Sequence, residues 1–133
     1  MLDYNKENLK IVTEIIKKNL SIDLLPKKKW ISKNKDNPLF GHCYNVVSCL
    51  YKIFGFKNVK MYRGFDGEIY HWWLLDKDGQ IIDPTSEQYT IVGKLPPYNK
   101  AQKYGTLGPN YREKVNKLYD KVIIELKNTL TKQ

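Results

Sequence analysis

Hydrophobic residues recur at helical spacing in the first part of the chain. Leu9, Val12, Ile16 and Leu20 fall on one stripe, with charged and polar residues at most of the positions between them. This spacing predicts a helix over Asp3–Leu20 that packs through one face. Residues 21–39 are mostly polar and end in a turn-rich Asn/Asp/Pro run, which predicts an irregular segment.

A second helical pattern lies in the run GHCYNVVSCLYKIFGF. Its apolar stripe consists of Cys43, Val46, Val47, Leu50, Ile53 and Phe54. Gly55 fits the C-terminal cap, where glycine is favoured because the backbone turns left-handed. The pattern predicts a helix that ends at Gly55 and carries Cys43 in its first turn, on the buried face.

The middle of the chain changes to the alternating pattern of β-strands. We predict strands over Asn58–Phe65, Ile69–Leu75 and Gln80–Asp83. The segment between the last two strands, Lys77-Asp78-Gly79, fits a three-residue hairpin loop with the glycine in the left-handed conformation.

This loop length fixes which side chains share a face of the hairpin. It pairs Trp73 with Asp83, so that Asp83 lies diagonal to His71 on the same face. A loop of two or four residues would put His71 and Asp83 on opposite faces.

A connection rich in proline, glycine and tyrosine follows, KLPPYNKAQKYGTLGP. Residues Leu95–Asn110 are too many for a simple connector, and they suit either a lid over a cleft or a packed irregular loop. Helical spacing then returns, with Asn110 and Glu113 placed as a capping box. The apolar stripe of this last helix consists of Val115, Leu118, Tyr119, Val122 and Leu126.

The composition is that of one soluble domain. The chain has 133 residues, 41% hydrophobic and 28% charged, which is enough for one core but not for two ordinary domains. No apolar run approaches the roughly 20 residues that span a bilayer, and the N-terminal pattern differs from a signal peptide. Cys43 and Cys49 point about 120° apart around their helix and should not pair. We therefore expect a single domain over 1–133, cytoplasmic and without membrane contact.

Basic residues outnumber acidic ones, 23 to 14, which gives a net charge of +9. Such an excess favours an acidic partner surface or nucleic acid. The lysines, however, are spread through the terminal helices and the Lys27-Lys28-Lys29 run, beside abundant Asn, Ile and Tyr, as an AT-rich genome would encode. A solvated basic surface is therefore the favoured interpretation, and nonspecific nucleic-acid binding stays as an alternative.

Cys43, His71 and Asp83 can together form a nucleophilic site. A helix N-terminus offers free N–H groups and a partial positive charge, which stabilise a thiolate. His71, on the strand against which the helix packs, could hold that thiolate as an ion pair and then protonate a leaving amine. Asp83 would accept the other ring N–H and fix the tautomer. The backbone N–H of Cys43 would face the oxyanion of the intermediate.

The segment Gly41–Thr85 resembles the core of the transglutaminase-like group of papain-like cysteine enzymes. The matching motifs are, in chain order, Gly41-His42-Cys43, Gly55-Phe56, Arg63-Gly64-Phe65, His71-Trp72-Trp73 and Asp83-Pro84-Thr85. The resemblance implies an α+β fold in which the cysteine helix packs on a small antiparallel sheet, flanked by N- and C-terminal helices. It also implies a Cys-His-Asp triad that attacks a protein or peptide amide through a thioester, as a peptidase, amidase, deamidase or cross-linking enzyme. We expect no cofactor.

The whole chain is also similar to small uncharacterised proteins of bacteria and their phages that share the Pro-Pro-Tyr and Gly-rich segment. That likeness implies no activity.

The sequence departs from the family pattern around the expected cleft. Trp72 and Trp73 follow the histidine, and a bulky indole there would narrow the cleft. Papain-like enzymes supplement the oxyanion N–H with a glutamine upstream of the cysteine. The nearest counterpart here is Asn37, one carbon shorter, and Trp30 could instead supply an indole N–H.

Other chemistries have weaker support. His42, Cys43, His71 and Asp83 could supply metal ligands, but no Cys-x-x-Cys or His-x-x-x-His pair occurs, so we predict no metal site. His42 is expected to face solvent beside the substrate cleft, where it could tune the thiol.

A structural interpretation exists for each triad residue taken singly. Cys43 could be a small buried apolar residue, His71 a core histidine bonded to a carbonyl, and Asp83 a cap of the Pro84-Thr85 turn. The order and register of the three together favour the triad.

The alternative function is a non-catalytic binding or inhibitory protein on the same scaffold. Its aromatic strand residues, with the +9 charge, could stack on a nucleotide or nucleic acid, and a phage-encoded chain could block a host factor. Aromatic residues of this kind more commonly fill a small core.

Overall fold

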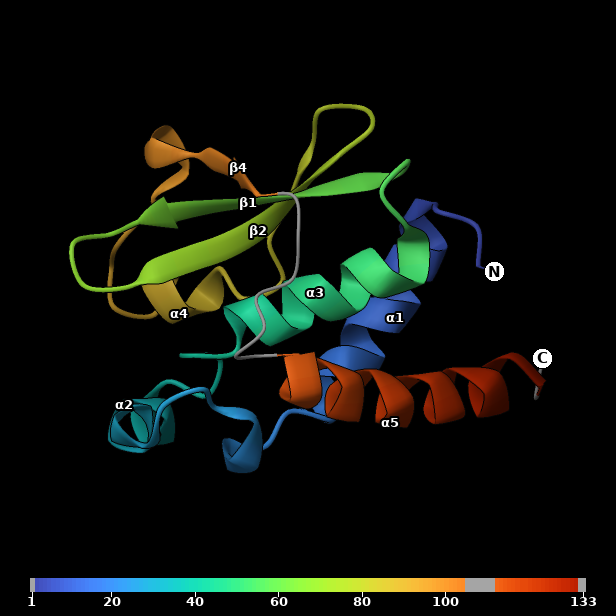
Figure 1. The fold of residues 1–133 in the computed structure, drawn as a ribbon, viewed down its shortest axis with the longest axis horizontal. Helices are drawn as coiled ribbons and strands as arrows, with labels where there is room; N and C mark the ends of the chain where they lie inside the picture. Colours follow the sequence, from blue (N-terminus) through green and yellow to red (C-terminus); the bar gives the residue numbers. More distant parts are fainter. Residues whose placement is uncertain (1, 105–111, 132–133) are drawn as a thin grey trace.

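The computed structural model describes residues 2–104 and 112–131, which form an α+β fold (Figure 1). The helices are α1 (Lys6–Lys18), α2 (Ile31–Asp36), α3 (Cys43–Phe54), α4 (Glu87–Thr90) and α5 (Arg112–Thr131). The strands are β1 (Val59–Phe65), β2 (Tyr70–Asp76), β3 (Ile81–Ile82) and β4 (Gln102–Tyr104). Three short 3₁₀ turns are η1 (Ile22–Leu24), η2 (Lys28–Trp30) and η3 (Tyr98–Lys100).

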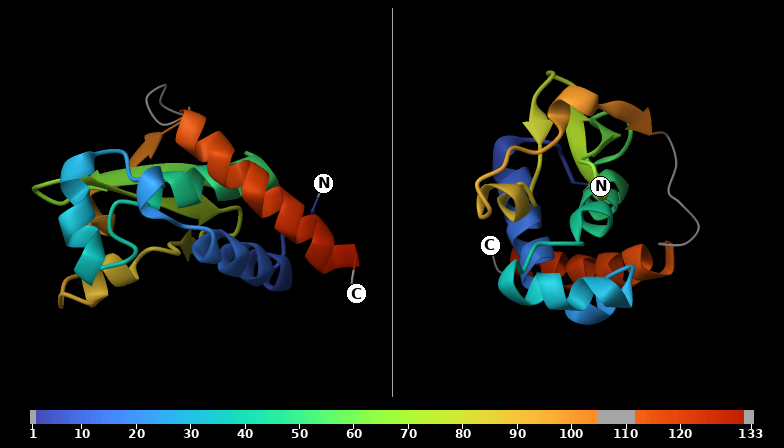
Figure 2. Two further views of the ribbon diagram at one scale, coloured as in Figure 1. Left: turned by 90° about the horizontal axis from the view of Figure 1, so that it is seen from below. Right: turned by 90° about the vertical axis from the view of Figure 1, so that its left-hand side faces the viewer.

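The strands form one antiparallel sheet in the order β3-β2-β1-β4. Helix α3 packs against β1 and β2, and α1 and α5 pack against α3. Helix α5 lies on the side of α3 that faces away from the sheet, so α3 is the middle layer (Figure 2). The predicted small sheet, with a cysteine helix packed on it and flanking terminal helices, is present.

Helix α3 is apolar because it is covered on both sides. Ten of its twelve residues are buried, and the predicted stripe lies in the core. Gly55 ends the helix with φ of 84°, as its cap position requires. Cys43 and Cys49 are both buried and unpaired, as their spacing predicted. Burial raises the pKa of Cys49 to about 12 and so keeps that thiol protonated.

The terminal helices follow the predicted stripes. Helix α1 is shorter than predicted, since Asn5 caps it by accepting a hydrogen bond from the Asn8 backbone N–H (2.8 Å). The apolar stripe of α5 is buried at Val115, Leu118, Val122 and Leu126. Asn110 of the predicted capping box lies outside the described residues. No helix in the described ranges combines the length and apolar character that crossing a bilayer requires.

The hairpin register agrees with the prediction. Leu74 pairs with Ile82, and the Asp76 N–H donates to the carbonyl of Gln80 (2.9 Å), a register that sets Asp83 opposite Trp73. Gly79 has φ of 81°, the left-handed conformation that the three-residue loop needs. Strand β3 itself has only two paired residues.

Among the elements that were not predicted are α2 and β4. The polar segment 21–39 contains α2, whose last turn is held by the Asn34 side-chain amide, which donates to the carbonyls of Pro38 and Phe40 (2.9 Å each). The connection after residue 94 contains β4, which pairs with β1 through Met61 and Tyr104. The described part of the long connection is therefore packed on the sheet edge.

Candidate active site

The site is formed where the N-terminus of α3 meets the edge of β2. Strand β3 pairs only with Leu74 and Leu75, so in the described structure it leaves the edge of β2 open at Tyr70 and His71. The Sγ atom of Cys43 lies there, 3.9 Å from the carbonyl oxygen of Tyr70. Because β3 is short, it does not cover this part of β2, and Cys43 can approach the strand that carries His71.

His71 and Asp83 form a buried pair. The His71 Nε2 lies 2.7 Å from Oδ2 of Asp83, and the two side chains are 0% and 4% exposed. The hairpin register brings them together, because both side chains lie on the face of β2 away from α3. The predicted diagonal placement of these two residues is confirmed.

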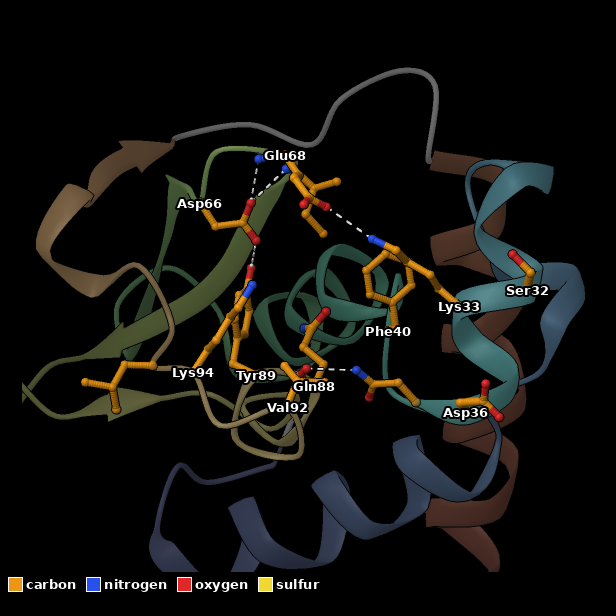
Figure 3. A pocket seen from close by; sticks show the side chains of 13 residues that line it. Ser32, Lys33, Asp36, Phe40, Asp66, Glu68, Gln88, Tyr89, Val92 and Lys94 are labelled. Atoms are coloured by element: carbon orange, nitrogen blue, oxygen red, sulfur yellow. Dashed lines mark hydrogen bonds and ion pairs between the residues drawn. The ribbon is translucent and has the colours of Figure 1, made fainter.

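The imidazole of His71 is held between two aromatic rings. Trp73 stacks on it with ring centroids 5.8 Å apart, and Tyr89 packs against it edge-to-face with ring centroids 4.8 Å apart. The hydroxyl of Tyr89 donates to Asp66 (2.6 Å), which fixes that ring (Figure 3). The histidine therefore has little freedom to turn away from its partners.

The protonation of His71 depends on both neighbours. Burial alone would lower the pKa of this histidine, but its interactions with Asp83 and with Cys43 raise the pKa of His71 to about 9. Because Nε2 faces Asp83, Nδ1 is the nitrogen available to Cys43. At neutral pH the ring is therefore an imidazolium beside the cysteine.

Gln88 also contacts Nδ1 of His71, the ring nitrogen that does not face Asp83. Its Nε2 lies 3.1 Å from His71 Nδ1 and 3.1 Å from Oγ1 of Thr85, while its buried Oε1 has no described partner. A half-turn of this amide would put Oε1 where it accepts from a protonated Nδ1 and from the Thr85 hydroxyl. No pattern in the sequence pointed to Gln88, which comes from the single turn α4.

Tyr98 holds the carboxylate of Asp83. Its hydroxyl donates to Oδ2 of Asp83 (2.6 Å), and its ring packs edge-on against Trp73 (5.1 Å between centroids). Burial and the bond to Asp83 raise the pKa of Tyr98, so the phenol stays a donor. Sequence reasoning missed this residue. The two prolines before it fix the backbone, and they were the one available signal.

Gly64 explains how close the Tyr98 segment comes to the sheet. A Cβ atom at this position would lie 2.5 Å from the carbonyl oxygen of Pro97 and 3.1 Å from the Trp73 ring. Only glycine leaves room for this approach. The Arg63-Gly64-Phe65 motif thus has a packing role beside His71, with which Gly64 pairs across the sheet.

Two cavities flank the site. The smaller, about 340 Å³, is lined by Cys43 together with Trp30, Tyr44, Arg63 and Trp72, among others. The larger, about 520 Å³, is lined by Gln88 and Tyr89, among others (Figure 3).

The turn between β1 and β2 contributes to both cavities through Glu68 and Ile69. Glu68 reaches Lys33 of α2 in an ion pair of 3.1 Å. This contact therefore ties the strand turn to α2 beside the two cavities.

The two tryptophans that follow His71 lie on opposite faces of β2. Trp72 lines the Cys43 cavity and contacts Tyr44 edge-on, 4.7 Å between centroids. Trp73 is 2% exposed and packs behind His71. One indole therefore forms a wall of the cavity, and the other supports the histidine.

The two candidate oxyanion donors are differently placed. Trp30 lines the Cys43 cavity, and its ring packs against Gly41, where a Cβ would lie 3.0 Å from it. Asn37 lines the larger cavity, and its side-chain amide donates to the carbonyl of Gln88 (2.8 Å). The amide of Asn37 is therefore already engaged.

The expectation that His42 faces solvent is wrong. The residue is 2% exposed, and burial lowers its pKa to about 4, so the ring is neutral at physiological pH. The cause is the central position of α3, which buries even the residue that precedes it. Gly41 and Cys43, but not His42, are among the described residues that line the Cys43 cavity.

Comparison with known proteins and the search for metal ligands gave no match. No protein-family model, curated protein or solved structure matches the chain significantly. Among the described residues, no group of three or more His, Cys, Asp or Glu side chains is arranged to hold a metal ion.

Proposed function

We propose that the protein is a cysteine-dependent acyl-transfer enzyme, a hydrolase, deamidase or peptidase, that attacks an amide of a protein or peptide. One observation carries the proposal. The first turn of α3 places Cys43, with its Sγ 3.9 Å from the Tyr70 carbonyl oxygen, beside the next residue of β2, a buried His71 whose Nε2 lies 2.7 Å from Asp83. This is the arrangement that activates a thiol and returns a proton to a leaving group.

In the first half of the reaction the Cys43 thiolate attacks the amide carbonyl carbon. A C–S bond forms, and the carbonyl π electrons move to the oxygen. When the tetrahedral intermediate collapses, the C–N bond breaks and the imidazolium of His71 gives its proton to the departing nitrogen. The products are an amine and a thioester on Cys43.

In the second half His71 is neutral and acts as the base. It takes a proton from water, or from an acceptor amine, as that nucleophile attacks the thioester carbon. The C–S bond then breaks, the acid or new amide leaves, and the thiolate pairs again with the protonated histidine. Asp83 keeps the imidazole in the tautomer that presents Nδ1 to Cys43.

The oxyanion formed in both halves needs hydrogen-bond donors. The backbone N–H of Cys43, in the first turn of α3, is one such donor, and the positive end of the helix adds to its effect. We assign the second donor to the indole N–H of Trp30, because Trp30 shares the cavity with Cys43 whereas the amide of Asn37 bonds to Gln88.

We also propose that the domain has a papain/transglutaminase-like core. The support is the order of its parts: a cysteine at the start of a central helix, a histidine on the strand packed against it, and an aspartate after the next strand. The α+β arrangement alone is common to many unrelated functions, so this assignment rests on the site.

The two cysteines offer a test of the proposal within one molecule. Iodoacetamide should alkylate Cys43 much faster than Cys49, because Cys43 lines a cavity beside an imidazolium while Cys49 is 0% exposed. Peptide mass mapping over time gives both rates. Equal rates at the two residues would contradict the proposal.

A second candidate is a non-catalytic binding or inhibitory protein on the same scaffold. It is favoured by the low exposure of Cys43, 4%, and by the contact of Gln88 with the nitrogen that the thiol would use. Replacement Cys43→Ser separates the two candidates. A binding protein keeps any cellular effect of the chain after this change, whereas the acyl-transfer enzyme loses it.

A further inference from the structure

Arg63 shares the cavity of the nucleophile. It lies on β1 directly opposite Trp72 of β2, so the two side chains project from the same face of the sheet, the face covered by α3. Both residues line the Cys43 cavity, and Arg63 is half-buried there.

Aromatic rings surround the guanidinium group. Its Cζ lies 4.1 Å from the ring centroid of Tyr70, 5.0 Å from that of Tyr104 and 5.6 Å from that of Trp72. Ring faces attract a cation but accept no strong in-plane hydrogen bond, so the donor edge of the guanidinium is left to other partners. Its buried Nε has no hydrogen-bond partner in the described structure.

The charge of Arg63 is not balanced by a carboxylate in the described structure, where no ion pair involves it. Among the residues that line the cavity, Glu68 is the acid, and it is paired with Lys33. Lys27 adds a second positive charge to the same lining. The cavity that contains the nucleophile therefore has an excess of positive charge.

We propose that Arg63 binds a carboxylate of the substrate, and that the amide attacked by Cys43 lies next to an acidic side chain or a chain-terminal carboxylate. This inference rests on the proposed function and names its substrate class. A guanidinium can bind a carboxylate through two parallel hydrogen bonds, which select for the orientation of the bound group as well as for its negative charge. The surrounding rings hold the arginine in place, so little conformational freedom is lost on binding.

The test compares iodoacetate with iodoacetamide on the full chain. Both form an S–C bond at Cys43 and release iodide, but only iodoacetate carries a carboxylate. The ratio of the two alkylation rates at Cys43 should exceed the ratio for a free thiol such as glutathione by roughly fivefold, which corresponds to about 1 kcal/mol of attraction. This excess should fall at high salt, since the attraction is electrostatic.

Variants assign the effect to one residue. In Arg63→Gln the excess in the rate ratio should disappear. In Arg63→Lys the excess should fall in part, because lysine keeps the positive charge but lacks the two parallel N–H donors of a guanidinium. Lys27→Gln removes a charge from the same cavity and should change the ratio less than Arg63→Gln does. If Lys27→Gln abolishes the excess and Arg63→Gln leaves it, the inference is overturned.

The failures of the two proposals are distinguishable in the wild-type protein, whether or not the variants fold. If Cys43 reacts faster than Cys49 with both reagents but shows the rate ratio of a free thiol, the carboxylate site is overturned and the proposed function stands. If Cys43 reacts with neither reagent faster than Cys49 does, the proposed function fails and the inference fails with it.

Protection experiments identify the source of the carboxylate. N-acetyl-aspartate amide presents a side-chain carboxylate, N-acetylglycine presents a terminal one, and N-acetyl-asparagine amide is the neutral control. Slower alkylation of Cys43 by iodoacetamide in the presence of one acidic compound supports the inference and names the source. Protection by neither acid beyond the control would overturn it.

Discussion

The hydroxyl of Tyr98 donates a hydrogen bond to Oδ2 of Asp83, the same oxygen that faces Nε2 of His71. One carboxylate oxygen is thus held from two sides, by bonds of 2.6 and 2.7 Å, inside a buried environment. The second oxygen of Asp83 is buried without a described partner. Tyr98 therefore restrains the side chain that in turn orients the histidine.

Removing the Tyr98 hydroxyl should affect both stability and the site. In Tyr98→Phe we expect a loss of about 2 kcal/mol in the free energy of unfolding, measured with urea, since one buried hydrogen bond to a charged group is lost. The rate of Cys43 alkylation should fall, by roughly threefold. Tyr51→Phe is the matched control, because the hydroxyl of Tyr51 makes none of the described hydrogen bonds. A similar effect of both variants on Cys43 would contradict this role.

A methyl group at Gly64 should disturb the position of Tyr98, and through it the restraint on Asp83. In Gly64→Ala the new Cβ meets the backbone oxygen of Pro97, which cannot move without shifting Tyr98. We expect a loss of about 1–3 kcal/mol in stability, together with slower alkylation of Cys43.

Gly79→Ala is the control for Gly64→Ala. Gly79 has φ of 81° and open space around its Cβ position, so this variant should lose about 1 kcal/mol through backbone strain alone. Thermal unfolding should therefore show a loss of stability in both variants, whereas slower alkylation of Cys43 is expected only in Gly64→Ala. Unchanged Cys43 reactivity in Gly64→Ala would argue against a link between this contact and the site.

Stability should be highest near pH 6.5, because the two histidines titrate in opposite directions. The pKa of His71 is raised to about 9, so its contribution is complete below pH 6.5 and is lost as the pH rises toward 9. The pKa of His42 is lowered to about 4, so its contribution is complete above pH 6.5 and is lost as the pH falls toward 4. Each of these two contributions to the free energy of unfolding should amount to roughly 3 kcal/mol.

Urea unfolding across this pH range measures both limbs of the curve of stability against pH, the acidic limb below pH 6.5 and the alkaline limb above it. His71→Ala should flatten the limb between pH 6.5 and 9, and His42→Asn should flatten the limb between pH 6.5 and 4. Above pH 9 ionisation of Cys49 adds a further loss in both proteins, since its pKa is raised to about 12. Retention of the alkaline limb in His71→Ala would show that another group causes it.

The role of Trp30 can be separated from that of the thiol by the choice of reagent. Acylation of Cys43 by p-nitrophenyl acetate passes through an oxyanion, whereas alkylation by iodoacetamide does not. Trp30→Phe should therefore slow the burst of nitrophenolate by roughly tenfold and leave alkylation unchanged. Asn37→Ala should leave the burst unchanged, since its amide bonds to Gln88. The opposite pattern would assign the donor to Asn37.

The local parts of this fold could be predicted from the sequence. The hairpin register follows from the three residues of its loop, and the α3 boundary follows from its apolar stripe and Gly55. Both depend on neighbours in the chain, which is why spacing and turn chemistry were sufficient. The same register placed His71 beside Asp83.

The parts that depend on distant contacts could not be predicted. Strand β4 has three residues and exists only because β1 offers it an edge. Gln88 contacts His71 and Tyr98 contacts Asp83 from segments without a periodic pattern. The burial of His42 likewise results from the layers around α3 rather than from its own sequence context.

The most direct test of the central claim is the rate of Cys43 alkylation by iodoacetamide at pH 7 in the wild type, His71→Ala and Asp83→Asn. Folding of each variant is checked by circular dichroism, and Cys49 is the internal reference. If His71 holds the thiolate and Asp83 orients His71, the rate should fall by roughly tenfold or more in His71→Ala and by a smaller factor in Asp83→Asn. A Cys43 rate that is the same in all three folded proteins would contradict the account.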